Sequence, residues 1–201
     1  MIISAPDDTV ARLALTGGAT DAQLRASLEA DDEAVTNWTV ASAAGNLATS
    51  ARTADSTQKI DGTNSIKYAA ATAAGGAATG WIVYNIGTGL TAYSKLSVWL
   101  RPSAITNITF KVFTNDAADN TSPTWISSAL TLTAGAWNYV ELSPSAGATD
   151  AYVGLEVAIG AASTSVDTFI DNLRFYNDSV VVDVAGDLNA TAPPSWYRFL
   201  S

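Results

Sequence analysis

The sequence predicts an all-β sandwich made of two antiparallel sheets. Apolar and polar residues alternate in several short runs, for example along Ile108–Phe113 and from Val153 to Ile159. This period of two is typical of a strand with one buried face. The runs recur roughly every 10 to 15 residues with turn sequences between them, as an all-β sandwich requires. Because 48% of the 201 residues are hydrophobic, the chain can bury one sizeable core.

The composition excludes several classes of function. Ten Lys and Arg against 19 Asp and Glu give a net charge of −9, which disfavours nucleic acid and anionic membranes as partners. The chain has no Cys and no His, so disulfides, Ser-His-Asp triads and His-ligated zinc are excluded within one chain. We therefore expect a protein that is not an enzyme.

The first residues, Met-Ile-Ile-Ser-Ala-Pro-Asp-Asp, lack the basic region and apolar core of a secretory signal. No apolar run approaches the roughly 18 residues of a membrane span. If Met1 is the native start, we expect synthesis in a cytoplasm without export by that route; a mature fragment behind a new Met would look the same.

Residues 1–27 are expected to form an arm outside the sandwich. Pro6-Asp7-Asp8 would begin a short helix that Gly17-Gly18 ends, and Thr20-Asp21 would cap a second helix from Ala22 to Leu28. That second stretch could equally be a strand.

The strands are expected between residues 28 and 177. A β-segment is expected near Leu47 to Thr53, and Asp61-Gly62 supplies a turn into a strand that reaches Tyr68. Ala69 to Gly80 is nearly all Ala, Gly and Thr and is interpreted as a loop. A strand from Trp81 to Ile86 follows.

Later strands are expected in the stretch that Pro102 ends, along Ile108–Phe113, from Gly135 to Leu142 and along the inward row from Val153 to Ile159. Thr168 to Tyr176 is the last strand. Phe169, Leu173 and Phe175 are expected to share its core face with Asp171. A carboxylate there requires a bound cation or several backbone N–H donors.

Several of these stretches resemble one known family. They are Leu28-Glu29 before Asn37-Trp38, Ser65-Ile66-Lys67, Leu96 to Arg101, Gly135 to Leu142, and Ile170-Asp171-Asn172-Leu173. Together they resemble the jelly-roll β-sandwich shared by carbohydrate-binding modules and galactose-binding-like domains. The resemblance implies a jelly roll over residues 28–177, with the arm 1–27 before it and an extension, 178–201, after it.

The resemblance also implies a structural Ca²⁺ site. Asp171 matches the Asp of the family's Ile-Asp-Asn, Glu29 matches its early Glu, and the turn at Asp61 is a looser match. Ca²⁺ takes six to eight oxygen ligands, including loop carbonyls. The alternative is that backbone N–H groups compensate Asp171 and that Glu29 is a surface acid.

A carbohydrate site would need exposed aromatic rings beside polar side chains. The candidates are Trp81, Tyr84 and Trp125; Trp99 and Trp137 match family aromatics that pack in or against the core. Hydrolysis by paired carboxylates from Asp116, Asp119 or the Asp31–Glu33 cluster is disfavoured, because these lie in solvated loops.

Two functions follow. The first is a virion structural protein, such as a bacteriophage capsid decoration or tail-associated protein, that contacts other virion proteins or copies of itself. The aromatic tip after Pro193-Pro194 would anchor it through Trp196, Tyr197, Phe199 and Leu200. The alternative is a carbohydrate-binding module of a secreted, glycan-active protein, which would be extracellular and bind glycan.

Overall fold

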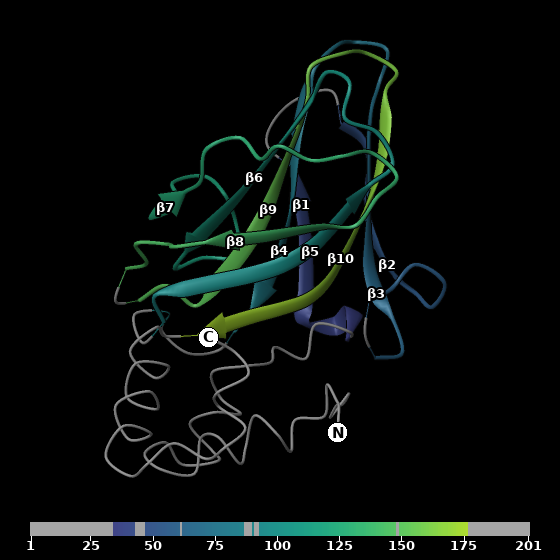
Figure 1. The fold of residues 1–201 in the computed structure, drawn as a ribbon. Helices are drawn as coiled ribbons and strands as arrows, with labels where there is room; N and C mark the ends of the chain where they lie inside the picture. The colour runs from purple at the N-terminus through teal and green to yellow at the C-terminus, as the bar shows by residue number, and fades with distance from the viewer. Residues whose placement is uncertain are drawn as a thin grey trace, which may run out of the picture.

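The structure is a computed structural model that describes residues 34–42, 47–60, 62–86, 90, 93–147 and 149–176. These residues form a sandwich of two five-stranded sheets, and all paired strands are antiparallel (Figure 1). The expected jelly-roll β-sandwich is confirmed. No helix in the described part of the chain is long and apolar enough to cross a membrane.

Sheet A has the strand order β1-β4-β9-β6-β7 and sheet B the order β2-β3-β10-β5-β8. In sheet A these strands are Trp38–Ser42, Ala78–Asn85, Tyr152–Ile159, Ile108–Asn115 and Trp125–Ile126. In sheet B they are Leu47–Asp55, Ser65–Thr72, Ser165–Tyr176, Lys95–Pro102 and Asn138–Leu142. A short 3₁₀ helix, η1 (Val35–Asn37), precedes β1.

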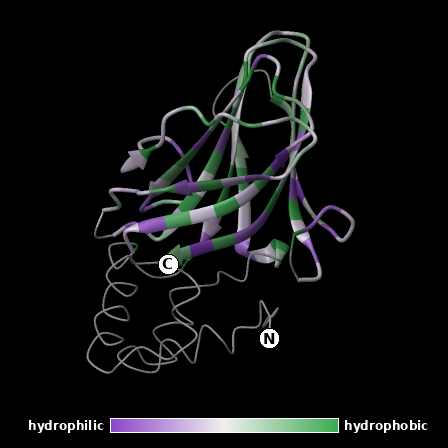
Figure 2. Ribbon diagram, viewed as in Figure 1, coloured by the Kyte–Doolittle hydropathy of each residue, from purple (hydrophilic) through white to green (hydrophobic). Residues whose placement is uncertain are grey.

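The core lies between the sheets and takes every second residue of most strands. Figure 2 shows the resulting alternation of hydrophobic and hydrophilic bands along β5. The inward row expected on β9 is confirmed, and so is that on β6; their side chains are all buried in the core: Val153, Leu155, Val157, Ile159, Ile108, Phe110 and Val112.

The Ala-, Gly- and Thr-rich tract 69–80 was expected to be a loop, and this is wrong at both ends. β3 continues to Thr72 and β4 already begins at Ala78. Within β3, Ala69, Ala70 and Ala71 pair with Ala51, Ser50 and Thr49 of β2. A Cβ on Gly80 would lie 2.3 Å from the Tyr68 hydroxyl, so this glycine makes room for a fully buried tyrosine.

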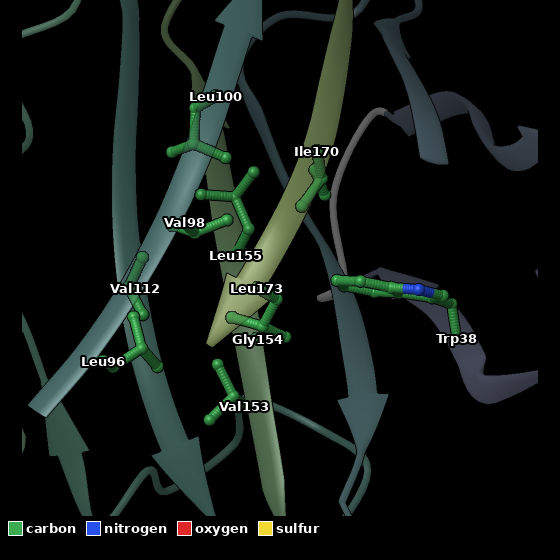
Figure 3. A pocket seen from close by; sticks show the side chains of 10 residues that line it. All are labelled: Trp38, Leu96, Val98, Leu100, Val112, Val153, Gly154, Leu155, Ile170 and Leu173. Atoms are coloured by element: carbon green, nitrogen blue, oxygen red, sulfur yellow. The ribbon is translucent and has the colours of Figure 1, made fainter. Parts of the chain in front are cut away.

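A cavity of about 20 Å³ lies between the sheets. Figure 3 shows side chains from β1, β5, β6, β9 and β10 converging on it. The lining is apolar and the volume is close to that of one water probe, so a water there would lack polar partners. This cavity is a packing void, and the functional site must be sought on the surface.

Candidate functional site

The outer face of sheet A carries a polar and aromatic row across three strands. Trp81 of β4 pairs in register with Glu156 of β9, and Glu156 pairs with Lys111 of β6. Their neighbours along each strand, such as Ile82 and Leu155, point into the core. The three side chains of the row therefore lie on the outer face, because successive residues of a strand alternate between faces.

The adjacent row of the same face is made of small residues, Thr79, Ala158 and Thr109. With Asn107 and Gly160 they help to line an open depression of about 570 Å³. The depression exists because the side chains here are short, whereas the row beside it carries Trp, Glu and Lys. A hollow of this size, bordered by an aromatic and two charged residues, can hold a small polar ligand.

Glu156 is held from two sides. Its Oε1 lies 3.7 Å from Lys111 Nζ, and its Oε2 accepts a hydrogen bond of 2.5 Å from Asn120 Nδ2. Asn120 belongs to the loop of residues 116–124, which follows Asn115 at the end of β6. Glu156 pairs with Lys111, which lies four residues before Asn115 on β6. Because Asn120 reaches Glu156, this loop must fold back over the outer face.

The returning loop explains a second apolar cluster on this face. Trp81, Val83 and Phe113 form a cluster separate from the main core and are almost fully buried, Phe113 completely. Phe113 lies between Lys111 and Asn115 on the outer side of β6, so the loop from Asn115 to Asn120 passes over it.

Two buried polar atoms next to Glu156 have no hydrogen-bond partner. They are Trp81 Nε1, a donor, and Asn120 Oδ1, an acceptor. Trp81 is the register neighbour of Glu156, and Asn120 donates to it. An unsatisfied buried donor or acceptor costs about 1–3 kcal/mol. Both atoms are closed off from solvent, and neither residue lines the depression.

The three rings predicted to bind carbohydrate do not form one platform. Trp81 lies on the outer face of sheet A and is 6% exposed. Tyr84 points into the core, where its ring contacts Trp38 edge-on at 5.1 Å. Trp125 packs against the core from β7, level with the buried Thr114. Residues 81 and 84 are three apart on one strand, so they face opposite sides.

Asp171 does not lie on the core face where the sequence placed it. Asn172 has a φ of 54°, and the pairing of β10 with β5 shifts register between Asp171 and Arg174. This bulge turns Leu173 and Phe175 into the core, while Asp171 and Phe169 lie on the outer face of sheet B. The expectation that Phe169, Asp171, Leu173 and Phe175 share one face is therefore wrong.

The predicted Ca²⁺ ligands are only partly within the described residues. Glu29 and Asp61 lie outside them. Asp171 is 2% exposed, and its Oδ2 accepts a 2.5 Å hydrogen bond from the Ile60 backbone N–H. No cluster of three or more potential metal-ligating side chains occurs in the part of the chain that the structure describes. The calcium site stays a prediction.

Other candidates fall outside the described residues or have structural contacts. The anchoring residues Trp196, Tyr197, Phe199 and Leu200 and the Asp31–Glu33 cluster lie outside. Asp116 is exposed, and Asp119 accepts hydrogen bonds from the Thr121 N–H and the Asn115 amide within its own turn.

Sequence reasoning missed Glu156 and Asn120. Glu156 could have been found, because it is the one charged residue within the alternating run from Val153 to Ile159. Nothing in the sequence of the polar loop distinguishes Asn120 from its neighbours, since the loop's return path is a tertiary feature.

No protein-family model matches the sequence, and no curated protein is detectably similar to it. Solved structures do match. One is a β-sandwich carbohydrate-binding module studied for promiscuous specificity, with a TM-score of 0.55 and 13% identity over 75% of this chain; the match spans 61% of that chain. Another is the family 11 module from Clostridium thermocellum in complex with a β-1,3-1,4-mixed-linked tetrasaccharide. Its TM-score is 0.53 at 13% identity, and the match covers 75% of this chain and 95% of the other.

The chain shares its fold with carbohydrate-binding modules. A further family 11 module, from the cellulosomal cellulase Lic26A-Cel5E of the same organism, has a TM-score of 0.52 and 15% identity over 75% of this chain and 93% of the other. Identities this low establish the fold, and function must be argued from the surface.

Proposed function

We propose that this chain is a non-catalytic carbohydrate-binding domain whose ligand lies on the outer face of sheet A. The observation that carries the proposal is the open depression over Thr79, Ala158 and Thr109. It lies beside the row of Trp81, Glu156 and Lys111 on the same face, so a sugar has room next to polar side chains. The shared fold with carbohydrate-binding modules agrees with this choice.

Each residue of the site has a separate part in binding. Sugar rings would sit over the small residues Thr79, Ala158 and Thr109. Their hydroxyls would accept from Lys111 and donate to Glu156, whose carboxylate Asn120 holds in place. The short side chains allow close approach of the ring, and the polar groups at one side fix its orientation.

The same face argues for binding without hydrolysis. Glycoside hydrolysis needs two carboxyl groups that flank the scissile bond. Among the strand residues described on this face, Glu156 is the only acid, and Lys111 and Asn120 already hold it. The absence of histidine from the sequence removes the usual alternative base.

A virion role depends on residues 1–27 and 178–201, which lie outside the described residues. No feature of the described sandwich favours that role over glycan binding. As a glycan-binding domain the protein would act outside the cell, on polysaccharide or on a cell-surface glycan.

The test is titration with soluble neutral polysaccharides, namely mixed-linkage β-glucan, xylan and galactan, followed by calorimetry and affinity electrophoresis. We expect at least one to bind, with Glu156→Gln and Asn120→Ala each weakening binding tenfold or more. Asp116→Asn, which removes a charge from an exposed position of the same loop, is the control and should bind normally. Unchanged binding by both variants, or no binding by the unsubstituted protein, would overturn the proposal.

A further inference from the structure

The opposite face of the sandwich carries a pair of aromatic rings, of which Tyr139 is exposed and Trp99 is partly buried. Trp99 of β5 and Tyr139 of β8 pair in register, and their ring centroids lie 5.3 Å apart with the planes at 54°. Their strand neighbours Val98, Leu100 and Val140 point into the core. The two rings therefore stand on the outer face of sheet B, although the sequence placed Trp99 in or against the core.

On the side away from Tyr139, this pair borders a buried carboxylate. Asp171 pairs in register with Trp99 on the side away from Tyr139, and the Ile60 N–H donates to Asp171. The backbone of Ile60 thus lies next to Asp171; the Ile60 side chain is 41% exposed, and that of Tyr139 is 53% exposed. Of the large hydrophobic side chains exposed among the described residues, Tyr139 is the most exposed.

Arg101 lies two residues beyond Trp99 on the same face of β5. Its guanidinium carbon is 5.9 Å from the ring centroid of Phe169, its register neighbour on β10. Stacking of this kind orients the planar group and leaves its N–H donors free to bond a ligand. Arg101 forms no ion pair with any residue that the structure describes, which is unusual in a chain with nearly twice as many acidic as basic residues.

An acceptor stands at the other side of the rings. The Tyr139 hydroxyl donates to Glu141 Oε2 at 3.2 Å, and Glu141 is exposed on the same face of β8. Farther along the sheet, Lys67 and Asp167 form an ion pair of 2.8 Å. The aromatic pair is therefore flanked by a cationic donor and an anionic acceptor, with no excess of one sign to select a charged ligand.

We propose that Trp99, Tyr139, Arg101 and Glu141 form a second glycan-binding site, for a neutral sugar unit. The apolar face of the ring stacks on the exposed side of Tyr139, beside Trp99. Arg101 donates to ring hydroxyls and Glu141 accepts from them. The site lies on the opposite sheet from the depression, so the domain holds two glycan chains, or two segments of one chain, at once.

The extent of the surface favours a sugar over a protein partner. A stable protein interface buries about 1,600 Å² in total around a core of several apolar side chains. The aromatic pair offers one strongly exposed ring, Tyr139, and a partly buried one, Trp99. One or two sugar rings need no more than this, and two sites on one domain raise the avidity for a polymer.

The experiment measures stoichiometry by calorimetry with oligosaccharides of the bound neutral polysaccharide, on the full chain. We expect two sites per chain, one site in Tyr139→Ala, one site in Glu156→Gln, and none in the double variant. Tyr139 is more than half exposed, so its removal should leave the melting temperature nearly unchanged, and Trp99→Ala gives an independent second variant. Ile126→Ala removes an exposed side chain from the edge of sheet A and should keep both sites.

The other possible results decide between the two sites, the ligand class and an interface between copies of the chain. A single site that Glu156→Gln abolishes would overturn this inference and keep the sheet A site. A single site that Tyr139→Ala abolishes would support the inference and overturn the sheet A proposal. A preference for polygalacturonate over neutral galactan would overturn the neutral ligand class. A dimer that Tyr139→Ala dissociates, without loss of sugar binding, would show that the face joins copies of this chain.

Discussion

The ring of Phe113 lies directly against Gly154 on the outer face of sheet A. They pair in register between β9 and β6, and a Cβ on Gly154 would lie 2.2 Å from Cζ of the Phe113 ring. The ring therefore lies flat across β9, where it contacts Trp81 and Val83. This contact helps to hold Trp81 beside Glu156, so the glycine supports the proposed ligand site from below.

We expect Gly154→Ala to lower the free energy of unfolding by about 1–3 kcal/mol, because the fully buried Phe113 ring has to move. Urea denaturation gives the value. Gly160→Ala is the control, since its Cβ would meet nothing closer than 3.4 Å. If the two substitutions had equal effects, the close approach of Phe113 would not be the cause.

Asp150 joins several loops at one end of sheet A. It is completely buried, and its carboxylate accepts hydrogen bonds from the hydroxyls of Thr114 and Thr124, both at 2.7 Å, and from the Gly147 N–H at 2.9 Å. We expect Asp150→Asn to lower the free energy of unfolding by about 1–3 kcal/mol. The Asn amide nitrogen is itself a donor, so it cannot accept the hydrogen bond that the carboxylate oxygen at its position accepts. Thermal melting tests this, with the exposed Asp116→Asn as control; a loss no larger than the control's would contradict it.

The sequence carried enough information for the sandwich because its strong signals are local. The inward rows of β6 and β9 are visible as alternation, and Pro102 does end β5. Two failures have different physical origins. One is the bulge at Asn172, which adds a residue to β10 and reverses the faces after it. The other is the tract 69–80, where Ala69 to Ala71 pair as a strand with Thr49 to Ala51 although both stretches consist of small residues.

The candidate sites were harder to foresee than the fold. Trp81 lies on an outer face but is only 6% exposed, and its role in sugar binding stays a prediction. The path of the loop that brings Asn120 to Glu156 depends on contacts between distant residues. Trp99 was expected in or against the core because it matches an aromatic of the resembling family, and such a match does not say which face of the strand is buried here. Its neighbours Val98 and Leu100 decide that in the structure.

The loop after β2 should respond to acid. The Gln58 N–H and the Thr57 hydroxyl, which bond the Asp55 carboxylate, lower its pKa from the ordinary value of 3.8. The folded form therefore binds this proton less readily than the unfolded chain. The stabilisation is complete above the unfolded pKa and is lost as the pH falls through the folded pKa.

We expect Asp55→Asn to flatten the dependence of melting temperature on pH below about pH 4 and to change it little near neutrality. The measurement is thermal melting from pH 2.5 to 6. Asp116→Asn, with the same charge change at an exposed position, should keep the wild-type slope. If Asp55→Asn kept the wild-type dependence of melting temperature on pH, ionisation of this carboxyl would not contribute to stability.

The same loop leads to Asp171. Asp55 orders its first turn, Ser65 Oγ donates to the Gln58 carbonyl, and Lys59 Nζ donates to the Gly62 carbonyl at 2.7 Å. These contacts place the Ile60 N–H on Asp171 Oδ2. A backbone donor is thus present at the carboxylate, which is one of the two ways to compensate its burial.

We expect Asp171→Asn to lower the free energy of unfolding by about 1–3 kcal/mol, because the Ile60 N–H would lose a charged acceptor. We also expect melting curves of the unsubstituted protein in excess Ca²⁺ and in EDTA to coincide, since the carboxylate already has a backbone donor. A bound ion would instead raise stability by RT ln(1 + [L]/Kd), about 2.7 kcal/mol at a hundredfold excess over Kd. Such a rise, absent in Asp171→Asn, would establish the calcium site and assign this carboxylate to it.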